Sequence, residues 1–394
     1  MARVSDTDNP YVKNILRLLL APILLSCAPR PHTAPVPMLP FAADTVRAQL
    51  VRTGVTHWFL YARSGPWAIH TLVVDRDACY SALAMKGADG AVGRKKTSVI
   101  FDELRRSADV VGGINGDFFL FTPPGVPANL LVSRGRLLTG PSLQPVLAID
   151  SLGAPLLTVF RVDGSVATMR DRFPIAAWNR PAPSGISVYD DGWGHSTDTL
   201  SNSIEVVVGG SGVGRVTMMD TMTAGVTIPP GGVVLVGRGS DARRALLTLH
   251  VGDTVRTSVA LRPFHPLEAV GGRPLLLRDS AIVAEVDTLG GRGFATTRHP
   301  RTAVGLGRGG RRLLLVVVDG RRKPYSDGMT LRELATLMRA LGARDAINLD
   351  GGGSTTLVYS DPDSAGRLRI ANQPSDSAGE RPVGDALAIV RGCS

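Results

Sequence analysis

Two aspartates that each follow an apolar run and precede glycine are the residues of this chain best suited to chemistry. Asp350 follows the run AINL and stands before three glycines, and Asp319 follows the run LLLVVV and stands before Gly320. Two carboxylates at one site act as acid and base, or as nucleophile and acid, on a glycosidic bond. Each aspartate alone also fits a turn that follows a strand, so both interpretations stay open at this point.

The residues that follow Asp350 suit an anionic ligand. Successive backbone N–H groups without side chains, as in Gly351 to Gly353, can form a concave nest for an anion, and the hydroxyls of Ser354 and Thr355 add donors. No lysine follows, which argues against a nucleotide-binding P-loop, and one aspartate supplies too few ligands for a calcium loop. A tight turn with a capping aspartate is the alternative.

The last third of the chain predicts a strand, a helix and a strand that bring the two aspartates together. Residues 313–318 and 346–349 are short apolar runs typical of buried strands. Between them, 331–341 has the spacing of an amphipathic helix, with Thr330 and Glu333 placed as a capping box. In such a βαβ unit the carboxyl ends of both strands lie on one edge of the sheet, where each strand here ends in Asp-Gly.

The rest of the chain reads as mostly β-structure. Residues 55–79 predict two strands joined by a Ser-Gly-Pro turn, and 97–111 predicts a helix. Residues 129–170 and 204–261 alternate short apolar runs with glycine-containing turns, which indicates hairpins, except for a helical pattern near 240–247. We therefore expect a mixed α/β fold: a β-rich mixed sheet with packed helices and a C-terminal βαβ unit in a single catalytic domain.

The N-terminus predicts export. Lys13 and Arg17 precede an apolar stretch, 18–25, that is too short to span a bilayer as a helix but suits a signal peptide. The sequence Leu-Leu-Ser-Cys that ends at Cys27 is similar to a bacterial lipobox, so we expect a lipid anchor in the cell envelope; an ordinary signal peptide of a secreted protein is the alternative. The predicted boundaries are 1–27 for the signal peptide, 28–45 for a Pro-rich tether and 46–394 for the catalytic domain.

Composition argues for a globular protein without a nucleic-acid partner. Of the 394 residues, 44% are hydrophobic and 20% charged, which argues against disorder. The net charge of +10 comes from scattered arginines rather than from a basic run. The expected partners are therefore a glycan substrate and, through the lipid anchor, a membrane.

The cysteines and acidic residues leave two points open. In an oxidising compartment Cys79 and Cys393 can form a disulfide, and two free thiols are the alternative. No Cys or His cluster has the spacing of a zinc site. We expect no required cofactor, although Asp and carbonyl groups near Asp350 leave a divalent cation such as calcium open.

Three further stretches hold candidate site residues that also have ordinary explanations. Asn115 and Asp117 flank a glycine in NGDFF, a pattern that commonly marks a turn. Arg301 enters a predicted strand, either as a surface charge or as a clamp for an anion. Glu380 and Arg381 stand before another strand, either as a salt bridge or with one side chain in a cleft.

Taken in order, these segments resemble the phosphodiester glycosidase family, whose best-known "uncovering" activity removes N-acetylglucosamine from a sugar-phosphate diester. The resemblance covers about residues 55 to 392, and its most specific part is the C-terminal block with DGR, SDGMTL and LDGGGST. The matching stretches are GGINGDFF (112–119), IPPGGVVLVG (228–237), EAVGGRPLLL (268–277), HPRTAVGL (299–306), VVVDGR (316–321), SDGMTLRELATLM (326–338), GARDAINLDGGGSTTLV (342–358) and ERPVGDALAIV (380–390).

The resemblance implies a mixed α/β domain that hydrolyses the bond between a sugar anomeric carbon and a phosphodiester oxygen. It implies catalytic roles for Asp350, Asp319 and Glu380. At position 117 the family also has a small or neutral residue, whereas this chain has Asp. The implied substrate-binding residues are Asn115, Asp117, Arg301, Ser326, Gly351, Gly352, Gly353, Ser354, Thr355 and Arg381. Arg321, which follows Asp319, is a further candidate from the residues alone, either as a ligand for an anionic group of the substrate or as a solvated charge.

The expected chemistry follows from the leaving group. Phosphate leaves readily, so one strong carboxylate can suffice, and stabilising the departing anion suits backbone amides, Arg301 and Arg381. We expect Asp350 to act as nucleophile or base, with Asp319 or Glu380 as the supporting acid or base. The alternatives are a phosphodiesterase that cuts the P–O bond and a surface lipoprotein that binds glycans without cleaving them.

Overall fold

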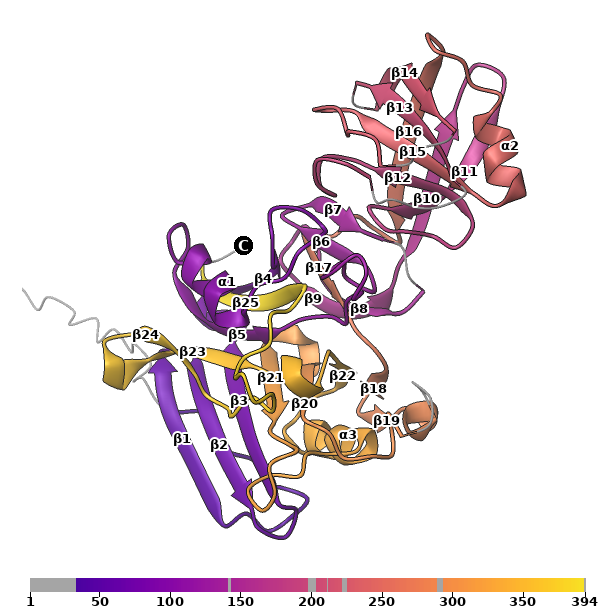
Figure 1. The fold of residues 1–394 in the computed structure, drawn as a ribbon. Coiled ribbons are helices and arrows are strands. Elements are labelled where there is room, and N and C mark those ends of the chain that lie inside the picture. The colour runs from indigo at the N-terminus through magenta and orange to yellow at the C-terminus, as the bar shows by residue number, and fades with distance from the viewer. Residues whose placement is uncertain are drawn as a thin grey trace, which may run out of the picture. The chain divides into compact units, whose positions relative to one another are not determined.

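An eight-stranded sheet forms the base on which the predicted site is built. The computed structural model describes residues 33–140, 143–197, 203–210, 212–221, 225–288 and 293–392. In spatial order the sheet contains β1 (Thr45–Arg52), β2 (Val55–Ala62), β3 (Trp67–Asp75), β21 (Arg312–Val318), β20 (Arg301–Leu306), β22 (Asp345–Asn348), β18 (Leu275–Arg278) and β19 (Ala281–Ile282) (Figure 1).

Two five-stranded sheets accompany the eight-stranded one. The first contains, in spatial order, β24 (Arg367–Ile370), β23 (Leu357–Asp361), β5 (Val110–Asn115), β25 (Asp385–Arg391) and β4 (Tyr80–Lys86). The second contains β7 (Arg136–Thr139), β6 (Leu131–Ser133), β17 (Glu268–Gly271), β8 (Pro145–Ile149) and β9 (Pro155–Val159). Both contribute side chains to a core that they share with the large sheet.

A closed seven-stranded barrel occupies the middle of the chain. Its strands are, in order, β10 (Arg161–Ala167), β11 (Arg172–Trp178), β12 (Gly185–Tyr189), β15 (Val233–Arg238), β13 (Ser203–Gly209), β14 (Val213–Asp220) and β16 (Thr254–Arg262). The sequence predicts the hairpin-rich character of this region but not the closure, which depends on pairing β10 with β16, about 90 residues further along the chain.

The described residues contain three α-helices: α1 (Thr97–Leu104), α2 (Ser240–Leu246) and α3 (Leu331–Ala340). The helix predicted over 97–111 is too long, because α1 ends at Leu104 and β5 begins at Val110. The helical spacing of apolar residues continues past this end, but Val110 pairs with Val390 of β25 instead. No helix among the described residues is long and apolar enough to cross a membrane.

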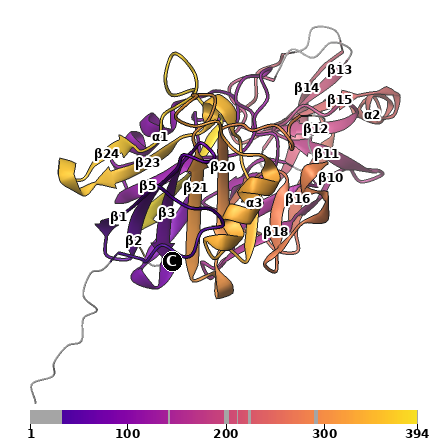
Figure 2. The same ribbon diagram turned by 90° about the horizontal axis from the view of Figure 1, so that it is seen from below.

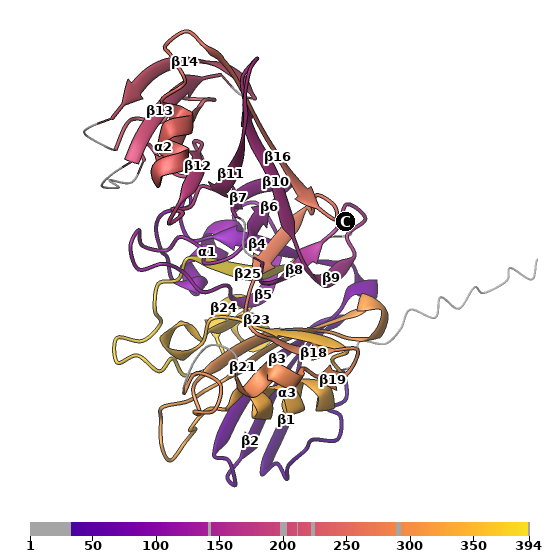
Figure 3. The same ribbon diagram turned by 90° about the vertical axis from the view of Figure 1, so that its right-hand side faces the viewer.

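The six apolar residues that precede Asp319 are explained by burial of β21 on both faces. Leu313, Leu315 and Val317 belong to the core shared with the five-stranded sheets. Leu314 and Val316 belong to a second cluster that includes the apolar face of α3, and α3 lies along the strands β18, β20 and β21 (Figures 2 and 3). Because side chains alternate along a strand, a strand covered on both faces is apolar throughout.

The predicted strand–helix–strand unit is present, with one strand inserted. β20 lies between β21 and β22 and is antiparallel to both. β21 and β22 are therefore parallel, and their carboxyl ends lie on one edge of the sheet. The amino end of β20, which carries Arg301, lies on the same edge because Arg301 is opposite Val318.

The N-terminal segment predicted as a tether packs on the protein where it is described. The Trp58 indole donates a hydrogen bond of 2.9 Å to the carbonyl of Ala34. The ring of Phe41 lies 5.1 Å from that of Trp67. The predicted signal peptide, including Cys27, lies outside the described residues. The structure also gives Cys79 a disulfide bond, while Cys393 lies outside the described residues, so the pairing of these two cysteines stays a prediction.

We predict that Thr330→Ala lowers the free energy of unfolding by about 0.5–2 kcal/mol. Thr330 accepts a hydrogen bond from the amide of Glu333, whose side chain accepts from the amide of Thr330, so the predicted capping box is present. Denaturant unfolding of the purified variants measures the change. The matched control is Thr336→Ala on the exposed side of the same helix, and equal losses in both variants would contradict the capping role.

Candidate active site

A pocket of about 230 Å³ lies where β21 and β22 end and β20 begins. Six of the residues predicted from the sequence line it, so the structure brings them together. The lining residues are Phe118, Phe294, His299, Pro300, Arg301, Arg321, Asp350, Gly351, Gly352 and Arg381.

Asp350 is the carboxylate of the pocket, and Asn115 holds its backbone. The Asn115 amide donates to the carbonyl of Asp350 at 2.7 Å, and the amide of Asp350 donates to the carbonyl of Gly116 at 3.0 Å. Removal from water raises the pKa of Asp350 to about 6, and the positive charges of Arg381 and Arg273 oppose this rise. A carboxyl group with this pKa exchanges its proton near neutral pH, as acid–base catalysis requires.

Asp117, predicted as a substrate-binding residue, is the second carboxyl group that interacts with Asp350. It is 1% exposed, and its oxygens accept hydrogen bonds from Phe118 and from the backbone and side chain of Asn129 at 2.7–2.8 Å. Burial raises the pKa of Asp117 to about 7 against the hydrogen bonds from Asn129 and Phe118, and the charge of Asp350 adds a smaller contribution to this rise. Asp117 does not line the pocket, but the charge of Asp350 acts on it, which makes it a further candidate for the partner carboxyl group beside Asp319 and Glu380.

Asp319 lies at the predicted edge but does not line the pocket. Its carboxylate accepts hydrogen bonds from the amide of Gln373 at 3.0 and 3.1 Å and from the Asn372 side chain at 3.1 Å. Its carbonyl accepts from the hydroxyl of Ser326 at 2.6 Å. Burial raises the pKa of Asp319 to about 6. These contacts hold two loops at the end of β21, so Asp319 is a positioning residue in this structure. The catalytic role predicted for Asp319 stays a prediction.

Glu380 also has structural contacts. Its carboxylate accepts from the amide and hydroxyl of Ser98, at 2.8 and 2.5 Å, in the first turn of α1. A carboxylate at this place satisfies a free helix amide and complements the helix dipole. Glu380 is 7% exposed and does not line the pocket.

The two predicted anion-clamping arginines differ in how their charge is used. Arg301 is 2% exposed and donates to the carbonyls of Met329, Phe294 and Thr297 at 2.6–3.1 Å. Arg381 forms a two-pronged ion pair with Asp376 at 2.8 and 3.0 Å. Arg301 thus fastens the loop before β20, and the charge of Arg381 is already balanced.

The three glycines do not form the anion nest predicted for them. The amide of Gly352 donates to the carbonyl of Pro300 at 2.9 Å, and that of Gly351 to the carboxylate of Asp350. Instead they allow close approach: a Cβ at residue 351 would lie 2.5 Å from the Pro300 carbonyl oxygen, and one at 353 would overlap the Arg381–Asp376 pair. Ser354 and Thr355 are buried behind this turn.

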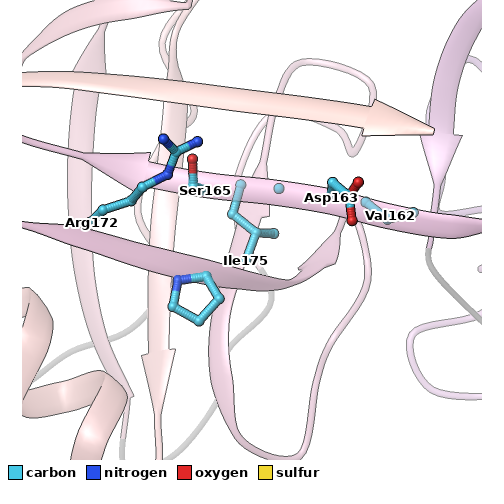
Figure 4. Close-up of a pocket in the computed structure, with 7 residues that line it drawn as sticks. Val162, Asp163, Ser165, Arg172 and Ile175 are labelled. Atoms are coloured by element: carbon cyan, nitrogen blue, oxygen red, sulfur yellow. The ribbon is translucent and has the colours of Figure 1, made fainter. Parts of the chain in front are cut away.

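A second pocket, on the barrel, holds none of the predicted residues. It lies where β10 and β11 diverge, and Figure 4 shows Val162, Asp163, Ser165, Arg172 and Ile175 around it. Asp163 forms an ion pair with Arg262 at 3.4 Å. In the described part of the chain, no three His, Cys, Asp or Glu side chains are grouped as metal ligands. The divalent cation left open by the sequence stays a prediction.

The sequence reasoning missed Asp385, which lies near Asp117, as well as the lining residues Phe118, Phe294, His299 and Pro300. Asp385 is fully buried, and its Oδ1 accepts a hydrogen bond from the amide of Asp117 at 2.7 Å, while its Oδ2 has no hydrogen-bond partner among the described residues. A Cβ at residue 116 would overlap Oδ1 of Asp385, so only glycine fits at this position. Burial raises the pKa of Asp385 well above its ordinary value, the charges of Asp117 and Asp350 add to this, and Lys86 opposes it. A signal existed in the sequence: an aspartate among the apolar residues of DALAIV.

We predict that Asp385→Asn stabilises the protein more at pH 8 than at pH 5. Since the pKa of Asp385 is raised in the folded state, unfolding at higher pH releases its proton and is favoured by rising pH. Asn keeps the oxygen that accepts from Asp117 but does not ionise, so the gain in unfolding free energy grows with pH, to the order of 1 kcal/mol or more.

Urea unfolding of both proteins across this pH range measures the gain. The control is Asp89→Asn, an exposed aspartate in a loop. A gain that is the same at pH 5 and pH 8 would contradict the assignment of a proton to Asp385.

Comparisons with known proteins agree with the resemblance in the sequence. Residues 202–390 match the family model "Phosphodiester glycosidase". No curated protein matches the sequence. A hypothetical protein from Synechocystis is 24% identical with a TM-score of 0.73, over 89% of this chain and 64% of that one. This chain thus spans less than two thirds of that protein.

Two other solved structures are similar over 91% of this chain. A Burkholderia pseudomallei protein proposed to be exported is 20% identical with a TM-score of 0.71 and is covered over 98% of its length. The catalytic domain of zebrafish N-acetylglucosamine-1-phosphodiester alpha-N-acetylglucosaminidase, auto-inhibited by its pro-peptide, is 18% identical with a TM-score of 0.44, over 84% of that chain. At these identities, the two structures with TM-scores above 0.7 establish the fold alone.

Proposed function

Because residues 202–390 match the family model "Phosphodiester glycosidase", we propose that the protein is a hydrolase that cleaves the sugar C1–O bond of a glycosyl-1-phosphodiester. The observation that carries the proposal is a pocket in which one carboxylate, Asp350, shares the lining with Arg321 and two aromatic rings. A carboxylate suits the anomeric carbon, a guanidinium suits the phosphate, and aromatic rings suit the apolar face of a sugar.

The proposed reaction needs one ionised carboxylate and one proton carrier. Asp350, as the anion, acts on the anomeric carbon as nucleophile or as base toward water. The C1–O bond breaks, and its electron pair leaves with the phosphate oxygen, whose negative charge Arg321 stabilises. Water supplies the new oxygen at C1, and Asp117 exchanges the proton that water releases. The products are a free sugar and a phosphate monoester.

The pocket also supports placing the sugar beside the rings of Phe118 and Phe294. Their centroids are 6.0 Å apart and the rings are inclined by 61°. Each ring has a guanidinium over it, Arg273 at 5.2 Å from Phe118 and Arg301 at 5.1 Å from Phe294. These cation–π contacts hold the rings in place, so the two side chains lose less conformational entropy when a sugar binds.

We further propose that the substrate is a phosphate-linked glycan or a cell-envelope polymer. The proposed location is outside the cytoplasm, by secretion or through a lipid on Cys27. Cleavage of the P–O bond, and glycan binding without cleavage, are the competing functions. Incubation with a sugar-1-phosphodiester separates them, since C–O cleavage releases free sugar, P–O cleavage releases sugar phosphate and a binding protein releases neither. In water enriched in heavy oxygen, the label enters the sugar only if the C–O bond breaks.

We predict that Asp350→Asn lowers kcat about 10²- to 10⁴-fold, because it removes the ionisable group of the pocket. In the unaltered protein kcat/KM rises with pH through about 6, the pKa of Asp350, because the carboxylate must be ionised. Asp117→Asn lowers kcat as well and alters the profile near pH 7. Steady-state rates on a sugar-1-phosphodiester from pH 4.5 to 9 measure these effects.

Asp163→Asn is the control for this prediction, because it makes the same change at the barrel pocket. Its rate should equal that of the unaltered protein. Full activity of a folded Asp350→Asn variant would exclude the assignment of Asp350.

A further inference from the structure

We infer that His299 is a positioning residue that holds Arg321 as the phosphate-binding cation of the pocket, and that this pair makes the site prefer a phosphorylated sugar to a neutral one. The inference rests on the proposed function for the identity of the ligand. It assigns the selection of phosphate to two side chains from different loops, one after β21 and one before β20.

Arg321 is the lining arginine whose charge is left for a ligand. Arg301 is buried and donates to three backbone carbonyls, and Arg381 is paired with Asp376. Within the described residues, Arg321 forms no ion pair with a carboxylate, and its side chain donates a hydrogen bond to His299. A guanidinium binds phosphate with two parallel N–H donors. Arg301 and Arg381 already use their donors within the protein, whereas Arg321 has donors left for a phosphate.

The backbone around Arg321 is built to place its guanidinium in the pocket. Its φ of 58° lies in the left-handed region, which residues other than glycine rarely adopt and which is retained where the surroundings enforce it. A Cβ at residue 352 would lie 3.3 and 3.4 Å from the two terminal nitrogens of Arg321. The middle glycine of the triplet therefore leaves space for this guanidinium beside Asp350.

His299 fixes the direction of that guanidinium. Its Nδ1 lies 3.3 Å from Nη2 of Arg321, and because arginine only donates, Nδ1 must accept, which requires a neutral imidazole. The His299 backbone exchanges two hydrogen bonds with Met329, at 3.2 and 3.0 Å, just before α3. Burial lowers the pKa of His299, and the positive charges of Arg301 and Arg321, which face it, lower it further. The neutral form is thus the stable one beside these two arginines.

The test measures binding separately from catalysis. Calorimetry in the Asp350→Asn background determines Kd for two probes, α-N-acetylglucosamine 1-phosphate and free N-acetylglucosamine. Arg321→Ala should weaken binding of the sugar phosphate roughly 10- to 100-fold, the loss expected for hydrogen bonds to a charged group, and should leave the free sugar unchanged. His299→Ala should weaken the sugar phosphate about 10-fold, again without effect on the free sugar.

His299→Asn is the rescue variant, because its side-chain oxygen can accept from Arg321 where Nδ1 does, and it should bind within about threefold of the parent protein. Arg244→Ala, which removes an exposed arginine from α2 on the barrel, should change nothing. In the active background, His299→Ala should raise KM for a sugar-1-phosphodiester and also lower kcat, because Arg321 both binds the phosphate and stabilises the charge that it gains on leaving.

Each outcome has a distinct meaning. If sugar phosphate binds in an Arg321- and His299-dependent way but no diester is hydrolysed, the proposed function fails and the anion site stands. If hydrolysis occurs but His299→Ala binds sugar phosphate as tightly as its parent, or loses both probes equally, the inference is overturned. Failure of the parent protein to prefer sugar phosphate over free sugar overturns it too.

Discussion

The side chain of Asn115 is the constraint on which the arrangement of the site depends. It is fully buried at the end of β5. Its Nδ2 donates to the carbonyl of Asp350, and its Oδ1 accepts from the hydroxyl of Thr302 in β20 and from the amide of Thr356. One amide group therefore joins two sheets and the Asp350 turn. An apolar residue here would leave those three buried groups without partners, each at a cost of about 1–3 kcal/mol.

The fixed backbone allows carboxyl groups to be crowded behind the pocket. Asp117 follows Asn115 by two residues and Asp385 begins the neighbouring strand β25, so the pairing of β5 with β25 brings them together. Asp350 joins them from the large sheet. Loss of water raises the pKa of all three carboxyl groups, and neighbouring carboxylate charge raises the pKa of Asp117 and Asp385 as well. The fold thus keeps protons on these carboxyl groups near neutral pH, where well-solvated aspartates would be ionised.

Much of this could be predicted from the sequence because it is encoded locally. The apolar runs, the capping box and the Asp-Gly endings place Asp319 and Asp350 on one edge, as the parallel β21 and β22 confirm. What the sequence does not specify is the direction of side chains. Asp319 and Glu380 bind the 372–373 segment and Ser98, partners that are 53 and 282 residues away in the chain. No spacing rule reveals such contacts, and neither the barrel closure nor the pairing of Asp385 with Asp117 has a local signal.

The glycine triplet shows how one sequence pattern supports two different physical readings. Glycine permits both exposed amides and close approach of other atoms. The sequence favours exposed amides, because the triplet follows a carboxylate. In the folded protein, the amides of Gly351 and Gly352 are already used, and what the absent side chains admit are Pro300, Arg321 and Arg381. The turn therefore reaches an anion through the cations that pack against it rather than through its own backbone. Because β20 lies between β21 and β22, the edge presents Arg321 from one strand end and Asp350 from the other. Under the proposed function, this arrangement lets the cation meet the phosphate while the carboxylate meets the anomeric carbon.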